Sequence, residues 1–251
     1  MPAELTTVAD DLAVVHDGTT VRRYGGLAPD TVIDVDGVTG RTLPRPSGEL
    51  LCRIATVNDV HFGELEAGRI DDLEEGPVRC APDGAEPYPE MMNRAAAEEM
   101  VAIDPAAVFV KGDLSLDGTD DEWEAFEHCY RGAFGERLHV VRGNHDSYRH
   151  QNAYAGDSWV ELPGVAVALL DTALPGATTG RIERDQLDWL GSRAADTGLP
   201  VLVMGHHQQW VGTSGGNRSD DYFGLHPDSS DDLDECFSRH TNLVAYTAGH
   251  T

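Results

Sequence analysis

The sequence is poor in positive charge. Lysine occurs once, at Lys111, and 18 Lys and Arg residues stand against 44 Asp and Glu, which gives a formal net charge of −26. A chain this acidic repels polyanions, so nucleic acid and anionic membrane surfaces are not expected as partners. An anionic substrate would require a local inversion of the field, which bound divalent cations supply.

The sequence also lacks long apolar runs and paired cysteines. No run approaches the roughly 18 residues of a membrane span. The first six residues, MPAELT, carry neither a basic start nor an apolar segment, so no secretory signal is visible and a cytoplasmic location is expected. The cysteines form no C-x-x-C pair and are interpreted as free thiols in a reducing compartment. They are Cys52, Cys80, Cys129 and Cys236.

A length of 251 residues suits one large domain, alone or with a small appendage. Residues 1–48 differ from the rest. Short apolar segments at 12–16 and 32–36 predict strands, and Asp-Gly and Pro-rich turns separate them. The segment resembles half of a fibronectin-type sandwich but is too short to form one. We therefore expect a small β-rich appendage at 1–48, packed on a main domain at 49–251.

From residue 49 onward, strand and helix patterns alternate, which predicts an α/β domain. Strands are expected at 50–57, 107–110, 138–141, 165–170, 200–204 and 242–248, and helices at 90–103, 120–134, 183–195 and 233–240. The inner faces of two helices are assigned to Met91, Ala95 and Met100, and to Leu187 and Leu190. Residues 63–88 and 208–232 are predicted to be long loops that shape a substrate pocket.

The stretch RGNHD at residues 142–146 follows the strand that ends at Val141. Glycine allows the backbone to turn, Asn144 offers an amide oxygen, and His145 offers a ring that carries a proton near neutral pH. A strand followed by glycine and polar ligands indicates a site at the carboxyl edge of a sheet. Arg142 is a possible substrate-binding residue, and the alternative is a surface ion pair.

Other predicted strands end in the same way. The side chains at these ends are Asp59, His61, Asp113, His206, His207 and His250. Oxygen and imidazole ligands without thiolates suit Mn, Fe, Zn or Mg rather than a structural zinc site. Two carboxylates, an amide and several imidazoles exceed the needs of one ion. Two divalent ions that share a bridging carboxylate account for the set.

The order D-V-H at 59–61, G-D at 112–113, G-N-H-D at 143–146, G-H-H at 205–207 and G-H at 249–250 resembles the calcineurin-like metallophosphoesterase family. Within it, the chain is most similar to bacterial class III cyclic nucleotide phosphodiesterases. The resemblance covers residues 50–251 and implies a four-layer αββα sandwich of two mixed β-sheets flanked by helices. It implies Asp59 and His61 as ligands of a first metal, Asp113 as the bridge, Asn144, His206 and His250 as ligands of a second, and His145 as proton donor.

The implied reaction is hydrolysis of a small phosphate ester by a hydroxide held between the two ions. The substrate is a phosphodiester, such as a cyclic nucleotide, or a phosphomonoester, and the motifs do not choose between them. Asn144 adds a neutral oxygen, which leaves the site positive enough for an anion. The alternative is a catalytically weak scaffold that retains the fold for binding.

The chain departs from the family pattern at four places. The last family motif is G-H-x-H, and here it stops at Thr251, so we expect either a fragment that lacks the final ligand histidine or a first site that lost a ligand. Leu116 stands where related chains often carry an aspartate that supports the catalytic histidine, and Asp117 is one residue further on. Gln208 and Arg142 each replace a frequent proline. His207 is left as a substrate contact or as a residue that completes the first site.

Overall fold

The computed structural model describes residues 3–18, 20–70, 73–149, 152–212, 218–219 and 222–250. The chain divides into two compact units, Met1–Leu50 and Leu51–Thr251. Each unit is described by itself below.

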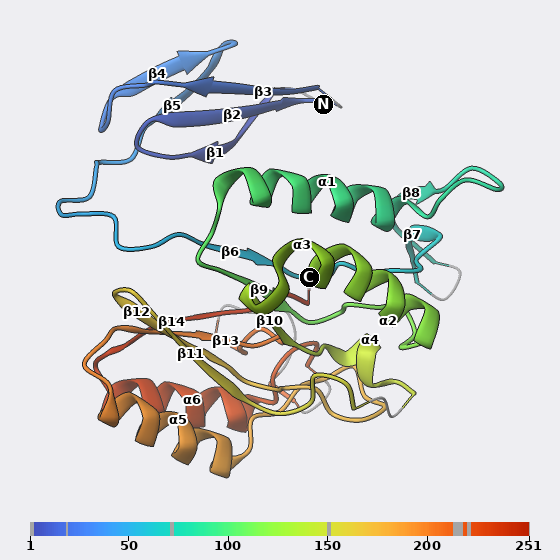
Figure 1. Ribbon diagram of the computed structural model, residues 1–251, viewed down its shortest axis with the longest axis vertical. Coiled ribbons are helices and arrows are strands. Elements are labelled where there is room, and N and C mark those ends of the chain that lie inside the picture. Colours follow the sequence, from blue (N-terminus) through green and yellow to red (C-terminus); the bar gives the residue numbers. More distant parts are fainter. Residues whose placement is uncertain are drawn as a thin grey trace. The chain divides into compact units, whose positions relative to one another are not determined.

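The first unit consists of β-strands only, within its described residues (Figure 1). Strands β1 (Glu4–Val8), β2 (Leu12–Asp17) and β3 (Thr20–Gly25) form an antiparallel sheet, and β4 (Val32–Val35) pairs with β5 (Val38–Arg41). Its small core contains Ala13, Val15, Ile33 and Val35. The two strands expected here are present. The other three were not predicted because their side chains are mostly exposed and show no regular apolar alternation.

The second unit begins with a parallel sheet of order β10-β9-β6. The strands are β6 (Ile54–Val57), β9 (Ala107–Lys111) and β10 (Leu138–Val141). Helix α1 (Tyr88–Ile103) and a continuous helical segment pack on this sheet through Met100, Tyr130 and Phe134. That segment runs through α2 (Asp120–Phe126), the π-helical η1 (Glu127–Arg131) and α3 (Gly132–Phe134), and the 3-10 turn η2 (Gly135–Arg137) follows it.

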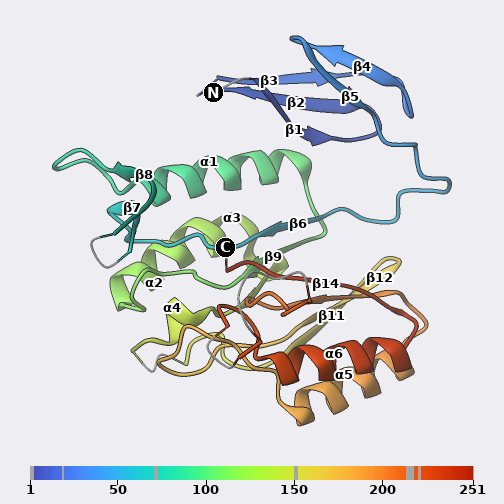
Figure 2. The same cartoon turned by 180° about the vertical axis from the view of Figure 1, so that it is seen from behind.

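A second sheet has the order β11-β12-β13-β14, with β11 antiparallel to β12 and the remaining pairs parallel. The strands are β11 (Ser158–Leu162), β12 (Val165–Leu169), β13 (Val201–Met204) and β14 (Leu243–Thr247). Helices α5 (Arg184–Asp196) and α6 (Pro227–Arg239) pack on it through Leu190 and Leu233 (Figure 2). Phe109 and Val141 of the first sheet contact Leu169 and Met204 of the second.

The second unit is thus a mixed α/β structure with several small sheets, and parallel pairing occurs in both of the larger ones. The expectation of two mixed sheets is wrong for the first, whose three described strands are all parallel. The predicted strand order along the chain is otherwise present, and β11 is an addition. Its residues are only half-buried, so the apolar alternation that marks a strand is weak.

Both predicted long loops contain regular structure. Residues 63–88 include a hairpin of β7 (Glu66–Ile70) and β8 (Leu73–Cys80), in a segment whose many acidic residues and Gly-Pro step obscure the strand pattern. Helix α6 starts at Pro227, six residues before the predicted start at 233. Proline at the first helical position is the signal that was missed.

The buried face of α1 also differs from the prediction. Met100 is buried, but Met91 and Ala95 are exposed, and Asn93 and Ala97 lie inside instead. Asn93 is accommodated because its amide donates to the Val60 and Pro89 carbonyls and accepts from Tyr130. A polar residue on the inner face concealed the true helical period. The prediction for α5 is confirmed, since Leu187 and Leu190 are buried.

Candidate metal centre

The carboxyl ends of five strands, β6, β9, β10, β13 and β14, meet at one place in the second unit. This is the edge at which α/β proteins place ligands. Three groups there have possible ligand atoms within 4.8 Å of one another. They are Asp59-Asp113-His206, His61-Asp113-His145 and His206-His207-His250. Asp113 belongs to two of these groups, which is the arrangement that a bridging carboxylate requires.

His206 lies at the middle of the cluster and has no exposed surface. Its Nδ1 lies 2.9 Å from the Lys111 carbonyl oxygen, which can only accept, so Nδ1 carries the hydrogen. Nε2 faces Asn144 Oδ1 at 3.0 Å, Asp113 Oδ2 at 3.2 Å and His250 Nδ1 at 3.2 Å. Three potential ligand atoms therefore lie within 3.2 Å of His206 Nε2.

A cation at this place would interact favourably with all of these oxygen and nitrogen atoms at once. The oxygen assignment of Asn144 is supported by its amide nitrogen, which donates to the Tyr148 hydroxyl at 2.6 Å. Without a cation, burial lowers the pKa of His206 but the Asp113 carboxylate outweighs it and the pKa is raised. The buried Nε2 of His250 and Nδ1 of His61 have no hydrogen-bond partner among the protein atoms described. The donor set of carboxylate, amide and imidazole fits a divalent ion.

The remaining ligand candidates lie around Asp113 at longer range. His61 Nε2 is 3.6 Å from Asp113 Oδ2, and the His61 and His145 rings are in edge contact at 4.7 Å between centroids. The Asp59 carboxylate accepts from the His250 backbone N–H at 3.0 Å. Burial alone would raise the pKa of Asp113, but the neighbouring imidazoles, led by His206, hold it well below its usual range.

The backbone is strained where these ligands sit. Asp59, His61, Asp113 and His250 have φ values of 53°, 43°, 49° and 62°, in the left-handed region that few side chains adopt. Such strain persists only where surrounding contacts enforce it, and it concentrates at functional sites. Here the His61 N–H donates to the Asp113 carbonyl at 2.9 Å, which joins the ends of β6 and β9.

Glycine is needed at two positions of the motifs because other groups approach closely. A Cβ at Gly112 would lie 2.5 Å from His206 Nδ1, and one at Gly143 would lie 2.2 Å from Asp113 Oδ1. Both distances are shorter than any real Cβ contact, so the ligands could not keep their positions. The glycines that precede the ligands thus serve the packing of the centre as well as the turn.

Asp146 was predicted only as the last residue of the G-N-H-D stretch, and the structure gives it a supporting role. Its buried carboxylate accepts from the backbone N–H groups of Leu114, Ser115 and Gly143 and from the Ser115 hydroxyl. It therefore ties the loop after β9 to the short helix α4 (Asn144–Ser147). An acidic residue in the first turn of a helix is the signal that could have identified it.

His145 receives its support from the main chain. Its Nδ1 lies 2.6 Å from the Leu116 carbonyl oxygen, and its backbone N–H donates to Asp113 Oδ1 at 3.1 Å. The Asp117 carboxylate instead pairs with Arg149 at 3.3 Å. A carbonyl at position 116 therefore fixes the His145 ring without an aspartate side chain, and Nε2 remains available for proton transfer.

Arg142 lies close to the cluster, and His207 belongs to one of its ligand groups, but their surroundings differ. The Arg142 Nε is 3.0 Å from Asp171 Oδ2. The expected surface ion pair is thus a buried one, because both side chains are less than a tenth exposed. His207 Nδ1 bonds to the Thr172 hydroxyl at 2.7 Å, and its buried Nε2 has no partner among the described residues. Burial, with help from His206 and His250, lowers the pKa of His207 to about 2, so its ring is neutral.

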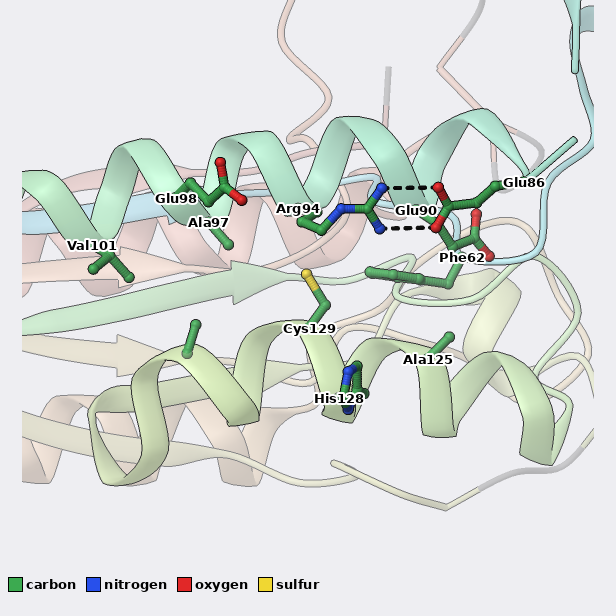
Figure 3. A pocket seen from close by; sticks show the side chains of 11 residues that line it. Phe62, Glu86, Glu90, Arg94, Ala97, Glu98, Val101, Ala125, His128 and Cys129 are labelled. Atoms are coloured by element: carbon green, nitrogen blue, oxygen red, sulfur yellow. Dashed lines mark hydrogen bonds and ion pairs between the residues drawn. The ribbon is translucent and has the colours of Figure 1, made fainter.

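The second unit has one hollow beside the candidate centre and a larger one between helices. A pocket of about 270 Å³ adjoins Asp59 and His61 and is also lined by Glu64, Tyr88 and Met92. A larger one of about 540 Å³ lies between α1 and the α2–η1 segment, and Figure 3 shows Cys129 pointing toward Arg94 there. Arg94 forms a two-pronged ion pair with Glu86 at the rim. None of the candidate ligands lines this larger hollow.

The sequence of residues 52–251 matches the family model described as calcineurin-like phosphoesterase. Because the match covers most of the chain, the protein belongs to this family, whose members are metal-dependent phosphoesterases. The resemblance inferred from the strand-end motifs is thereby confirmed. Within the described residues, no helix has the length and apolar character needed to cross a bilayer.

Two curated relatives are bacterial. A probable cyclic nucleotide phosphodiesterase of Synechococcus is 29% identical over 109 residues, which cover 41% of this chain and 42% of the relative. The 3′,5′-cyclic adenosine monophosphate phosphodiesterase CpdA of Pseudomonas aeruginosa is 30% identical over 143 residues, 55% of this chain and 51% of the relative. The chain thus matches about half the length of these relatives.

Two solved structures share the fold. A dimetal phosphatase from Danio rerio superimposes with a TM-score of 0.60 at 14% identity, over 80% of this chain and 82% of that chain. A purple acid phosphatase from yellow lupin gives a TM-score of 0.53 at 14% identity, over 92% of this chain and 45% of the other. At this identity the likeness concerns the fold alone.

Proposed function

We propose that the protein is a dinuclear metal-dependent phosphoesterase that hydrolyses a phosphodiester. The observation that carries the proposal is the position of Asn144 Oδ1, His250 Nδ1 and Asp113 Oδ2, each within 3.2 Å of His206 Nε2. Two divalent cations bound there would supply positive charge for the phosphoryl oxygens and lower the pKa of a water nucleophile.

Each ligand candidate has a role in this proposal. Asn144, His206 and His250 would hold one ion, Asp59 and His61 would hold the other, and Asp113 would serve both. Support for the sharing comes from the place of Asp113 in two of the three ligand groups. The metals remain a choice among Mn, Fe, Zn and Mg, because the donor set suits all four.

His145 is proposed as the general acid. The Leu116 carbonyl holds Nδ1–H, so a proton delivered to the leaving oxygen comes from Nε2. The ring contacts His61 and so lies beside the centre without being required as a ligand. Arg142 is left out of substrate binding because Asp171 already pairs with its guanidinium in the interior. His207, neutral and buried behind His206, is proposed to support that ring rather than bind substrate.

A cyclic nucleotide is the first substrate to test, since both curated relatives carry that activity in their names. We also infer the four-layer αββα arrangement. Three hydrophobic clusters support it: one between helices and the first sheet, one between the two sheets, and one between the second sheet and its helices. The catalytic domain is proposed as residues 49–251, with 1–48 as an appendage. The family match from residue 52 and the compact unit from Leu51 support this division.

The proposal is tested on the full chain stripped of metal and reloaded with Mn²⁺. Mass spectrometry should find two ions per chain, and the loaded protein should hydrolyse bis(p-nitrophenyl) phosphate and, at its own rate, 3′,5′-cyclic AMP. The competing possibility is a catalytically weak binding scaffold. It is favoured if metal binds but neither ester is hydrolysed, and the metal-site proposal fails if no metal binds.

A further inference from the structure

One exposed aromatic side chain lies directly on the candidate metal centre. Phe223 stacks on the His250 ring, with 3.9 Å between centroids and 23° between planes. His250 is only 4% exposed, whereas Phe223 is 54% exposed. One face of the Phe223 ring therefore covers a candidate metal ligand, and much of the remaining ring surface faces solvent.

Scattered exposed apolar residues are common and carry no meaning by themselves. Phe223 differs because its position is fixed from both sides. The His250 ring lies under it, and the Gln208 side-chain amide donates to the Phe223 carbonyl. The neighbouring Leu225 N–H donates to the Gln208 carbonyl at 2.8 Å, which holds the same turn. A loop that only covered the centre would bury such a ring and not leave it open.

We propose that Phe223 is a specificity-determining residue whose open face stacks on a planar organic substituent of the phosphate ester, such as a phenyl ring or a nucleobase. This inference rests on the proposed function of the same centre. An aromatic face accepts any planar group, because the contact depends on dispersion and ring electrostatics rather than on matched hydrogen bonds. It also binds organic groups without charge, which suits a chain with a net charge of −26.

The exposed Phe223 ring, called the platform below, and the proposed general acid His145 contact different candidate ligands. Phe223 lies on His250, and His145 contacts His61. A test must therefore vary the planar substituent while the leaving group stays the same. It must also separate stacking on the substrate from support of His250, since Phe223 contacts that ring.

The first experiment measures binding without turnover. The full chain loaded with Mn²⁺ is titrated with phenylphosphonate and with methylphosphonate in a calorimeter. The wild type should bind the phenyl compound about tenfold more tightly. Phe223→Leu keeps an apolar contact with His250 but removes the aromatic face, so it should lose this preference and retain its affinity for methylphosphonate. Phe223→Tyr should retain the preference.

The second experiment measures turnover of phenyl and methyl esters of p-nitrophenyl phosphate, which share one leaving group. Phe223→Leu should raise KM about tenfold for the phenyl ester, with little change in kcat or in either constant for the methyl ester. The control is Val244→Ala, which shortens another exposed apolar side chain, on β14. It should leave both esters unaffected.

Several results overturn the inference. A wild type that binds both phosphonates equally has no platform. Equal weakening of both phosphonates in Phe223→Leu, or a loss of bound metal, would mean that the ring only holds His250 in place. If the wild type binds phenylphosphonate preferentially but hydrolyses no ester, the platform stands and the proposed phosphoesterase activity fails.

Discussion

The two halves of the candidate metal centre differ in how completely the protein has assembled them. The buried half comprises Asn144, His206 and His250, which are at most 4% exposed. Their ligand atoms face one another at 3.0–3.2 Å. The open half comprises Asp59 and His61. The His61 Nε2 lies 3.6 Å from Asp113 Oδ2, and the His61 side chain is 20% exposed.

This difference shows which candidate ligands are held in position by the folded protein alone. The buried half is held by contacts that need no metal, among them the bond of His206 to the Lys111 carbonyl. Preorganised ligands bind an ion without first paying to order their side chains. The open half has more freedom, so an ion there must bring its ligands together. We expect the buried half to bind metal more tightly and the open half to limit activity.

Removing the residue that the halves share should have the largest effect. We predict that Asp113→Asn abolishes hydrolysis and lowers metal occupancy at both sites, because a neutral amide cannot bridge two cations as a carboxylate does. Bound metal per chain and turnover are measured together. Asp117→Asn is the matched control, since that carboxylate pairs with Arg149 outside the centre and should change neither value. Normal metal content and turnover in Asp113→Asn would remove the bridge from the mechanism.

Removal of His145, the proposed general acid, should leave metal bound in both halves. We predict that His145→Ala lowers kcat by about 10²–10⁴, the usual worth of a general acid, with metal content near that of the wild type. The loss should be smaller for a nitrophenolate leaving group, which needs little protonation, than for an alkoxide. Equal losses with both leaving groups would count against proton donation by His145.

The comparison of the halves is tested directly by titration. Mn²⁺ added to stripped protein should bind in one tight and one weak event, with activity following the weak one. Asn144→Ala should weaken the tight event, and His61→Ala the weak one, each by about 10–100-fold, as in other metal sites that lose one interaction. Two events of equal affinity in the wild type would show that the observed difference in order has no energetic consequence.

Lys111, the single lysine of the chain, supports the buried half without being a candidate ligand itself. Its carbonyl binds His206, and its buried ammonium donates to the Ala248 carbonyl at 2.8 Å, next to the His250 turn. We predict that Lys111→Met, of similar length, weakens the tight Mn²⁺ event by about tenfold through misplacement of His250. Lys111→Arg should recover much of the affinity. An unchanged titration in Lys111→Met would show that the turn holds itself.

Sequence reasoning reached the ligands more easily than their supports. Each of Asp59, Asp113 and His206 follows a strand whose apolar run is visible. The ends of neighbouring parallel strands must meet, which brings Asp59 and Asp113 together, although His206 follows a strand of the second sheet. The support of His145 by the Leu116 carbonyl could not be predicted, because a carbonyl is present at every residue and leaves no mark in the sequence. Phe223 was missed for a related reason, since it lies in an irregular segment without periodicity.

The elements of the fold were likewise predictable only where the apolar pattern is clear. Strands buried on both faces, such as β9, were identified from continuous apolar residues, whereas the exposed strand β3 was not. The hairpin of β7 and β8 lies in an acidic segment where composition suggests a loop. Asn93 on the inner face of α1 broke the apolar pattern, although its hydrogen bonds are fully accounted for in three dimensions.

The smallest effect on activity is expected at Arg142, which follows β10 directly beside the buried half. Its ion pair with Asp171 is removed from solvent, so Arg142→Met leaves a buried carboxylate without its cation and should cost about 3 kcal/mol of unfolding free energy. Hydrolysis per folded molecule should stay near wild type, because Asp171 rather than substrate occupies the guanidinium. Urea unfolding and steady-state kinetics measure the two quantities.

The matched control is Arg184→Met, whose partner Asp232 lies 3.5 Å away in an exposed pair and contributes about 0–1 kcal/mol. A further check is the double variant Arg142→Met with Asp171→Leu, which removes both charges and should regain most of the lost stability. A structural role for the Arg142 ion pair is ruled out if Arg142→Met raises KM at least tenfold while its stability is unchanged. That result would place the guanidinium on the substrate phosphate and extend the active site beyond the metal ligands.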